Sequence, residues 1–356
     1  MKKTIFSLAF ALLTLASCSN DDGDSLEIPT VGETLEAGIG GANQPNQVYL
    51  DLSTAQSSVV NRASWDFGFS TGSEFRVIIN GSVKMAVKKL ETSDITLIQV
   101  EDEGVNVSYN TLVSSGYVDN PTGVLDGAEV GQGTAIDEIS ETDSENKVYL
   151  VNLGFEVSTA TPDVGGVSVD GTSRGWKKVR ILRNGNGYKI QYADLTSTTY
   201  TEKTITKDAD FNFIFFSLNA AKTVSVEPEK NKWDLNFTTF TNYLGTVLYG
   251  YSDFIVSNRL GGTKVYQVLV AGDVTYEAFT KVDIVETNFD ASSLDQRIIG
   301  ANWRNGGSQS TLPSIKTDRF YVVKDAAGNY YKIKFLAMTN EAGVRGYTTF
   351  EYAILN

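Results

Sequence analysis

The chain has 356 residues, a formal net charge of −13 at pH 7 and no histidine. The acidic balance argues against a nucleic-acid-binding protein, because a phosphate backbone must be met by clustered lysine and arginine. Without histidine, the chain cannot build a Ser-His-Asp or Cys-His catalytic arrangement or a histidine-containing zinc site. Cys18 is the only cysteine, so no disulfide can form within the chain. The length predicts roughly two domains.

The N-terminal segment resembles a bacterial lipoprotein signal peptide. Two lysines follow Met1, residues 5–15 form an apolar run too short to span a bilayer, and small residues precede Cys18. Small residues before a cysteine resemble the lipobox, in which the cysteine is lipidated and becomes the mature N-terminus. We therefore expect residues 1–18 to be a signal peptide, with acyl chains on Cys18 as the membrane anchor. The alternative is an ordinary signal peptide with a chance cysteine.

Residues 19–45 are expected to form a flexible acidic tether. Asp21, Asp22 and Asp24 make its first part acidic, and glycine and proline recur up to Pro45. A short acidic tract directly after the cysteine resembles the surface-export signal of lipoproteins in the Bacteroidetes group. The alternative is a solvated linker without a role in export.

After the tether the pattern is that of β-strands. Residues 47–52 alternate apolar and polar side chains, and residues 65–69 place three aromatic side chains on one face. Asp66 lies on the opposite face, where we expect a structural role rather than catalysis. Residues 101–144 are acidic, glycine-rich and weakly periodic, which predicts long loops. The Asn-Gly-Asn-Gly segment at 184–187 lies between two strand patterns and predicts a hairpin.

The second half of the chain repeats the first. Trp-Asp-Phe-Gly-Phe at 65–69 matches Trp-Asp-Leu-Asn-Phe at 233–237, and a similar apolar run precedes each copy. The chain ends in a strand–turn–strand pattern over 319–335 and one more strand over 346–352. An internal repeat of this length makes half the chain the unit of folding.

We therefore predict an all-β fold of two tandem antiparallel modules with long loops. The first module is expected to cover residues 46–200 and the second residues 201–356.

These features together resemble the HmuY family of Bacteroidetes haem-binding lipoproteins. The shared features are the lipobox, the Trp-Asp-aromatic strand, a Phe-Tyr-Val-Val…Asp-Ala-Ala-Gly-Asn…Lys-Ile-Lys-Phe hairpin from Phe320, and a closing Gly-Tyr-Thr-Thr-Phe-Glu-Tyr strand from Gly346. The resemblance covers nearly all of residues 45–356, taken as two copies. It implies an all-β fold, a cell-surface location, and haem capture for delivery to a TonB-dependent outer-membrane receptor.

The iron ligands depart from the family pattern. The best-known members hold haem iron with two histidines between the Trp-Asp strand and the final hairpin, and others use methionines. The corresponding stretch, residues 265–315, contains no histidine, methionine or cysteine. Met85 and Met338 are the only methionines beyond the leader, and they lie in different predicted modules. Tyr266 and Tyr276 can in principle ligate ferric haem as phenolates. Packing in the core or at its edge is the alternative role for all four residues.

We expect an outer-membrane surface lipoprotein that binds haem or a related porphyrin and passes it to a TonB-dependent receptor. The alternative is an accessory lipoprotein of the same fold that binds a non-haem ligand or a partner protein. An enzyme such as a glycosidase needs two carboxylates about 5 to 10 Å apart. With 43 acidic residues, some pair meets that distance by chance. Acidic content is therefore no evidence of catalysis. We expect neither enzymatic activity nor a protein-bound metal site.

Overall fold

The computed structural model describes residues 33–112, 117–127, 132–307 and 311–356. The predicted signal peptide, Cys18 and the first part of the predicted tether lie outside these residues. All pairings between the described strands are antiparallel, which confirms the predicted all-β antiparallel fold. Among the described residues, no helix is long and apolar enough to cross a membrane.

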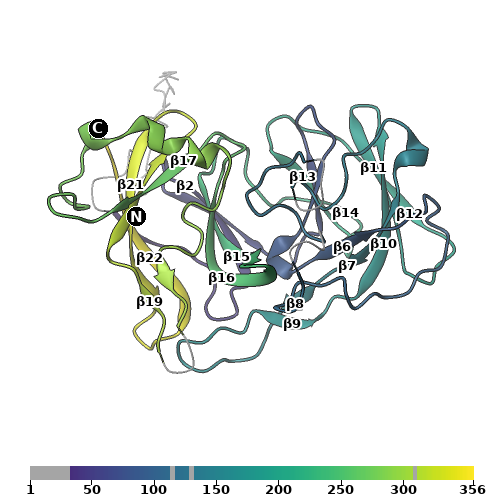
Figure 1. Ribbon diagram of the computed structural model, residues 1–356, viewed down its shortest axis with the longest axis horizontal. Coiled ribbons are helices and arrows are strands. Elements are labelled where there is room, and N and C mark those ends of the chain that lie inside the picture. Colours follow the sequence, from purple (N-terminus) through teal and green to yellow (C-terminus); the bar gives the residue numbers. More distant parts are fainter. Residues whose placement is uncertain (1–32, 113–116, 128–131, 308–310) are drawn as a thin grey trace, which may run out of the picture.

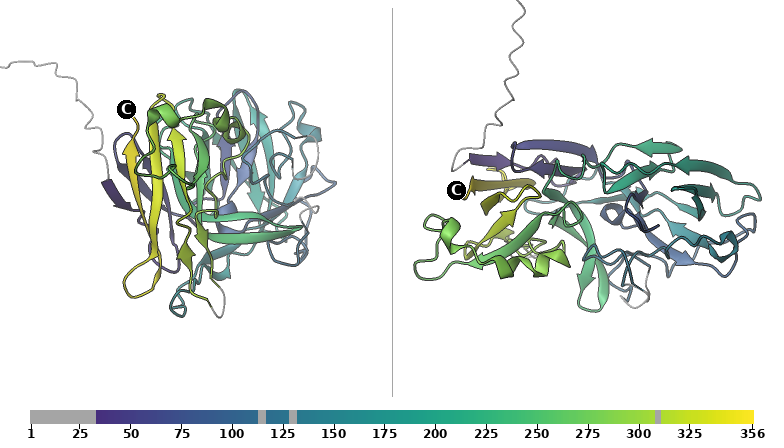
Figure 2. Two further views of the ribbon diagram at one scale, coloured as in Figure 1. Left: turned by 60° about the vertical axis from the view of Figure 1, so that its left-hand side comes forward. Right: turned by 90° about the horizontal axis from the view of Figure 1, so that it is seen from above.

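The strands form two lobes that lie side by side (Figures 1 and 2). The first lobe contains a five-stranded sheet in the order β12-β11-β10-β7-β6, a four-stranded sheet in the order β14-β13-β4-β5, and the small hairpin β8-β9. Its strands are β4 (Phe67–Ser70), β5 (Val77–Ile79), β6 (Ala86–Lys89), β7 (Val148–Asn152), β8 (Phe155–Val157), β9 (Asp170–Ser173), β10 (Trp176–Asn184), β11 (Gly187–Ala193), β12 (Thr201–Ile205), β13 (Phe213–Ser217) and β14 (Lys222–Val224).

The second lobe has the same plan, with a five-stranded sheet in the order β1-β22-β21-β20-β17, a four-stranded sheet in the order β16-β15-β2-β3, and the hairpin β18-β19. Its strands are β1 (Glu33–Glu36), β2 (Asn46–Asp51), β3 (Gln56–Asn61), β15 (Leu235–Leu244), β16 (Val247–Ser257), β17 (Lys264–Leu269), β18 (Arg304–Asn305), β19 (Ser314–Ile315), β20 (Arg319–Lys324), β21 (Tyr330–Thr339) and β22 (Arg345–Ile354). Short 3₁₀ helices complete the two lobes: η1 (Gly81–Val83), η3 (Asp143–Glu145), η4 (Lys281–Asp283), η5 (Glu286–Phe289) and η6 (Ala291–Ser293).

Each lobe takes one hairpin from the other half of the chain. The opening hairpin β2-β3 pairs with β15 of the second lobe, and its counterpart β13-β14 pairs with β4 of the first. Strand pairing therefore crosses the predicted boundary between residues 200 and 201. The first lobe is continuous from β4 to β14, whereas the second joins β1–β3 to β15–β22.

The last part of the predicted tether is folded. Residues 33–36 form β1 and pair with Tyr352 to Thr349 of β22, the last strand. Ala37 and Ile39 are buried in the core of the second lobe. The tether prediction is therefore too long at its C-terminal end, because the alternation of Leu35, Ala37 and Ile39 is masked by the neighbouring glycines.

The two Trp-Asp motifs hold the exchanged hairpins in the same way. In the first lobe the Leu218 N–H donates to Asp66 Oδ2 at 2.7 Å. In the second lobe the Leu52 N–H donates to Asp234 Oδ2 at 2.9 Å. Both aspartates are buried. The expected structural role of Asp66 therefore holds, and its carboxylate fixes the turn of a hairpin from the other half of the chain.

A second matched pair shows that the repeat extends beyond the motif. The Asn80 side-chain amide donates to the carbonyl oxygens of Arg62 and Trp65, each at 2.8 Å. The Asn258 amide donates to the carbonyl of its own tryptophan, Trp233, at 2.8 Å. The longer spacing in the second copy comes from the long β15-β16 hairpin.

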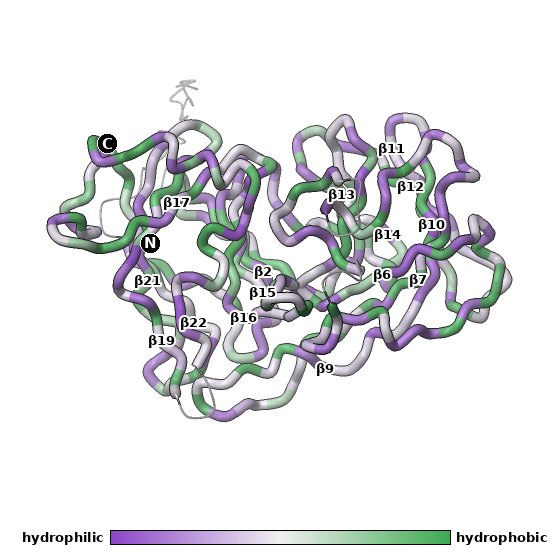
Figure 3. The backbone as a smooth tube through the Cα atoms, viewed as in Figure 1, coloured by the Kyte–Doolittle hydropathy of each residue, from purple (hydrophilic) through white to green (hydrophobic). Residues whose placement is uncertain are grey.

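Each lobe has its own hydrophobic core, and a third cluster lies where the lobes meet. Figure 3 shows the chain coloured by hydropathy: β13 is mainly hydrophobic, whereas β2 and β15 mix hydrophobic and hydrophilic residues. The junction cluster contains Trp65 and Trp233 together with Tyr49, Phe213, Phe215, Leu125 and Val226. The two copies of the motif thus contribute one tryptophan each to the same cluster.

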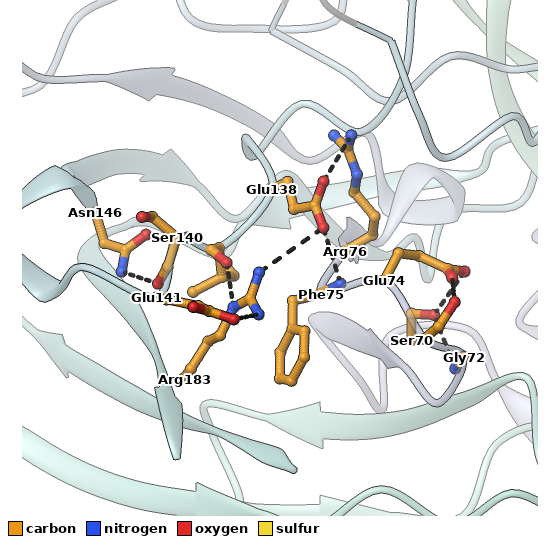
Figure 4. A network of polar contacts seen from close by, with 12 residues as sticks. Ser70, Gly72, Glu74, Phe75, Arg76, Glu138, Ser140, Glu141, Asn146 and Arg183 are labelled. Carbon is orange, nitrogen blue, oxygen red and sulfur yellow. Dashed lines mark hydrogen bonds and ion pairs between the residues drawn. The ribbon is translucent and has the colours of Figure 1, made fainter. Parts of the chain in front are cut away.

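The predicted long loops occupy the stretch between β6 and β7 and are fastened by polar contacts (Figure 4). Glu138 on this stretch forms an ion pair with Arg76 at 3.3 Å. The Arg183 guanidinium donates to the Ile139 carbonyl at 2.6 Å and lies 4.0 Å from the centre of the Phe75 ring. Arg183 directly precedes the predicted hairpin segment at 184–187, and the β10-β11 pairing confirms that hairpin.

Candidate functional site

Two cavities in the described residues are candidates for ligand binding. The larger, about 600 Å³, lies beside β17 in the second lobe. The smaller, about 160 Å³, lies between the lobes. Small-molecule sites usually measure about 300–1,000 Å³. Of these two cavities, only the larger has the volume of a cofactor site.

The larger cavity, which we call the Tyr266 pocket, is formed by β17 and the segment that follows it. β17 pairs with β20, and Tyr266 lies opposite Val322. The apolar lining residues are Tyr266, Val268, Leu269, Val274, Ala278, Phe279 and Val285. The polar lining residues are Gln267, Asp273, Asp283 and Asn288. The pocket therefore combines a mainly apolar wall with two carboxylates.

Tyr266 is the buried oxygen-bearing side chain of this wall. It is 6% exposed, and its ring packs edge-on against Phe289 with 4.7 Å between ring centres. Its hydroxyl makes no hydrogen bond of ordinary geometry. Burial raises the pKa of the phenol, and the nearby charges of Glu286 and Asp283 add to this increase, while the Val285 backbone opposes it. The side chain is therefore a neutral phenol at pH 7.

Asp283 is already engaged by the local backbone. Its Oδ2 accepts hydrogen bonds from the Thr280 backbone N–H at 2.8 Å and from the Thr280 hydroxyl at 2.9 Å. The bond from the Thr280 N–H is one half of a capping box at the start of η4, and both bonds lower the pKa of Asp283. The carboxylate thus stays ionised and orders the segment that covers the pocket.

Tyr276 belongs to the same buried hydrophobic cluster as Tyr266 and Phe289, but it does not line the Tyr266 pocket. Its ring packs edge-on against Phe320, with 5.8 Å between centres, and its hydroxyl donates to the Lys332 carbonyl at 3.4 Å. The Lys332 ammonium lies 4.7 Å from the centre of the ring. Burial raises the pKa of this phenol above its usual range. Tyr276 thus has a packing role and a satisfied hydroxyl.

The structure does not bring the two predicted methionine ligands together. Met85 is fully buried in the core of the first lobe, and Met338 is 2% exposed in the core of the second. Neither lines the Tyr266 pocket. The two thioethers therefore do not share one site in this structure, in agreement with their places in different predicted modules. Each fills core volume, which is the usual role of methionine.

A conventional metal site is not seen in the part of the chain that the structure describes. Within those residues, no group of three or more Asp, Glu, His or Cys side chains is placed to hold a metal ion.

The smaller cavity, which we call the inter-lobe cavity, contains both tryptophans of the repeated motif in its wall. Trp233 packs edge-on against Tyr49, with 5.0 Å between ring centres, and Trp65 packs edge-on against Phe215 at 4.7 Å. The motifs align Tyr49 with Phe215, so these are equivalent pairs from the two copies. The Trp65 indole N–H donates to Gln47 Oε1 at 2.8 Å.

Comparison with known proteins identifies the family. The sequence profile of the HmuY protein family matches residues 43–352. The chain belongs to the HmuY family. No curated protein matches the chain.

Solved structures similar to this HmuY-family chain are distant. One is a Bacteroides vulgatus protein described as HmuY-like and heme-binding, at 11% identity, with 91% of each chain covered and a TM-score of 0.23. Another is the apo HmuY analogue of Tannerella forsythia, at 10% identity, covering 94% of this chain and 100% of that one, with a TM-score of 0.25. A third is a Bacteroides fragilis protein described as a lipoprotein, at 14% identity, covering 46% and 83%, with a TM-score of 0.20. These scores are too low to place any residue of this chain.

The sequence of this HmuY-family chain predicted Tyr266 as a candidate ligand but not the residues around it. Val274 and Phe279 lie in a segment without regular periodicity, so the sequence carries no signal that they close a pocket. The inter-lobe cavity was also missed. The signal for it was the repeat itself, because equivalent aromatic residues meet where two related lobes pack.

Proposed function

We propose that this protein is a haem-binding surface lipoprotein that holds the porphyrin in the Tyr266 pocket. Family membership and the position of this pocket support the proposal. The pocket lies within residues 265–315, the stretch that carries the iron ligands in the best-known family members. Haem is here a cargo rather than a catalytic cofactor, and we propose no enzymatic reaction.

The Tyr266 pocket suits haem in volume and in most of its lining. Its volume of about 600 Å³ falls within the range of small-molecule sites. Val268, Leu269, Val274 and Phe279 supply apolar contact for the porphyrin face. Val274 and Leu269 are 44% and 55% exposed, so a bound macrocycle would remove apolar surface from water, which is favourable by about 25 cal/mol per Å².

Tyr266 is the residue that we propose as iron ligand. Tyrosine is an established haem ligand as the phenolate. Because burial raises the pKa of Tyr266, coordination would release the phenolic proton to solvent near pH 7. Haem binding through this oxygen should therefore strengthen as pH rises.

Charge favours one side of the pocket for the haem propionates. Arg319 donates to the lining residue Gln267 at 3.0 Å and also pairs with Asp318 at 2.8 Å. Asp273 and Asp283 would repel a propionate. We therefore propose that the propionates lie toward Gln267 and Arg319, away from the two aspartates.

Haemin titration of the full-length chain in detergent micelles tests the proposal. We expect a Soret shift that saturates at one haemin per chain. Tyr266→Phe should weaken haemin binding and remove the spectral features of phenolate ligation. Tyr276→Phe is the matched control, because that side chain has the same chemistry but does not line the pocket. An unchanged wild-type spectrum would contradict haem binding and favour an accessory lipoprotein with another ligand.

We also propose that the protein is anchored in the outer membrane through lipid on Cys18, at the cell surface, and passes haem to a TonB-dependent receptor. The lipobox, the acidic tract after it and the family resemblance support this location. Mass spectrometry of the N-terminal peptide should find diacylglycerol on Cys18. Protease treatment of whole cells should degrade the protein if it faces the medium. A pull-down should return an outer-membrane receptor.

A further inference from the structure

The inter-lobe cavity has features that haem binding does not use. We propose that it is a second binding site, specific for a small organic cation such as a quaternary or aromatic ammonium. The site does not depend on haem binding elsewhere. It is built from both copies of the repeat and therefore exists only where the two lobes meet.

The aromatic wall and the volume define the size of the ligand. Tyr49, Trp65, Phe215, Trp233 and Phe240 all line the cavity. Its volume of about 160 Å³ is close to that of the engineered cavity of about 150 Å³ that binds benzene. One six-membered ring or one tetraalkylammonium group fits this space, whereas a porphyrin does not. Aromatic rings, tryptophan above all, attract cations through their negative faces.

An unpaired buried carboxylate supplies the opposite charge. Glu227 is 5% exposed and lines the cavity. Its Oε1 accepts hydrogen bonds from the backbone N–H groups of Asn212 and Phe213, each at 2.9 Å.

Asp119 is a second carboxylate in the cavity wall. It accepts hydrogen bonds from the backbone N–H groups of Ile79 and Ala135, each at 2.8 Å. Among the described residues neither carboxylate has an ion-pair partner. Ionising a buried carboxylate without a cationic partner is costly, so a cationic ligand would stabilise the ionised form.

The cation already present in the wall, Arg259, forms no ion pair with these carboxylates within the described residues. The Arg259 guanidinium donates to the carbonyl oxygens of Ser293 and Gly123. The nearby charges of Asp126 and Asp295 act on it, and burial lowers its pKa. Arg259 therefore serves the contact between a first-lobe loop and the second lobe, and it leaves Glu227 unpaired.

Two neutral buried polar atoms of the wall are unsatisfied, in addition to Nε of the Arg259 guanidinium. Trp233 is 8% exposed and Asn236 5% exposed, and both line the cavity. The Trp233 indole N–H and the Asn236 side-chain carbonyl oxygen have no hydrogen-bond partner. Buried polar atoms in folded proteins are nearly always paired, by protein, water or ligand. These atoms are independent of the carboxylates and indicate that the cavity is shaped for an occupant.

Binding of a cation should release a proton. Burial raises the pKa of Glu227 to about 8 and that of Asp119 to about 7, although part of the Asp119 residue surface is accessible. Glu227 is thus mostly protonated at pH 7. A cation favours the ionised carboxylate and lowers its pKa, so affinity should increase from pH 6 to pH 8. Tyr49 stays neutral over this range, because burial and Glu227 raise its pKa.

Isothermal titration calorimetry on the full-length chain in neutral detergent micelles tests the site. The probes are tetramethylammonium and benzylammonium, with tert-butyl alcohol and benzyl alcohol as neutral counterparts. We expect at least one cation to bind with a Kd of about 1 mM or tighter, and about tenfold more tightly than its neutral counterpart. Titration in two buffers of different ionisation enthalpy should show proton release at pH 7.

Glu227→Gln tests the charge while keeping an oxygen for the Asn212 and Phe213 N–H groups. It should weaken cation binding at least tenfold, with an unchanged circular dichroism spectrum. Glu202→Gln is the matched control, because Glu202 on β12 pairs with Lys189 on β11 and does not line the cavity. If neither cation binds below about 10 mM, if neutral and charged probes bind equally, or if folded Glu227→Gln binds like wild type, the proposal is overturned. If Glu227→Gln fails to fold, the probe comparison and proton release on wild type decide.

Discussion

Asparagine substitutions at the two equivalent aspartates should change stability in opposite directions. Asp234 is 4% exposed, and burial raises its pKa to about 6. Its Oδ2 accepts the Leu52 N–H at 2.9 Å, and its Oδ1 accepts the Thr263 hydroxyl at 2.8 Å. In Asp234→Asn, the amide oxygen can still accept from Leu52, and the amide nitrogen can donate to the Thr263 oxygen. Both bonds survive, and the buried charge is gone.

The expected stabilisation by Asp234→Asn follows from the pKa of Asp234. In the folded protein this pKa is about 6, against an ordinary value of 3.8, and the difference is equivalent to about 3 kcal/mol. A raised carboxyl pKa means that the folded state binds the proton more tightly than the unfolded state. The wild type therefore loses stability as pH rises from about 4 to about 6, and Asp234→Asn avoids that loss. The variant should match wild type near pH 4 and be more stable by up to about 3 kcal/mol at pH 8.

Burial raises the pKa of Asp66 as well, although the Arg174 charge and the Leu218 N–H oppose the increase. Asp66→Asn should nevertheless be destabilising, because it leaves the buried Arg174 guanidinium without its anionic partner. Arg174 pairs with Asp66 Oδ1 at 2.7 Å, and the two side chains are 6% and 0% exposed. Removing one partner of a buried ion pair costs about 3 to 5 kcal/mol. Glu156 lies 3.6 Å from the same guanidinium and still offsets part of the Arg174 charge in the variant. We therefore expect Asp66→Asn to lower the free energy of unfolding by roughly 2 to 4 kcal/mol.

Urea unfolding followed by circular dichroism at pH 4, 6 and 8 measures both effects. Asp163→Asn, at an exposed position, is the control for the substitution itself. Our account of the motif would be refuted if Asp234→Asn were destabilising at pH 8, or if both asparagine variants shifted stability equally.

Three other predictions concern the proposed haem site and the cores. Met85→Leu and Met338→Leu should each cost less than about 1.5 kcal/mol in urea unfolding and leave haemin affinity unchanged, and a lost Soret band in either would contradict their core role. Haemin affinity, measured by absorbance titration, should increase from pH 6 to pH 9 in the wild type but not in Tyr266→Phe, since only the former releases a phenolic proton; parallel profiles would argue against ligation by Tyr266. Arg319→Ala should weaken haemin binding roughly five- to tenfold, the effect of about 1 kcal/mol, and equal affinity would place the propionates elsewhere.

Much of the local structure could be predicted from the sequence. The Trp-Asp strands, the hairpin at 184–187, the final hairpin and the closing strand all lie where alternation and turn residues predicted them. These signals are local, because strand periodicity and turn preference depend on a few neighbouring residues. The β1 strand was missed because its apolar alternation is brief and lies among glycines.

Pairing across the repeat could not be predicted in the same way. The β2-β3 and β13-β14 hairpins have nearly the same pattern, so each suits either Trp-Asp strand by local criteria. The choice depends on packing, such as Leu50 against Leu235 and Phe216 against Phe67. Tyr266 stays a predicted ligand. Its place beside a pocket could not be predicted, because the segment that closes the pocket has no periodicity.

The sequence alone determined the chemistry that this protein lacks and the repeated strand unit that it contains, because residue counts and short-range patterns require no knowledge of distant contacts. Only the tertiary structure decided that hairpins are exchanged between the halves, that Met85 and Met338 lie in separate cores, and that Trp65 and Trp233 meet at one cavity. Those outcomes depend on contacts between residues more than a hundred positions apart, and such contacts form when buried surfaces fit together rather than from any pattern along the chain.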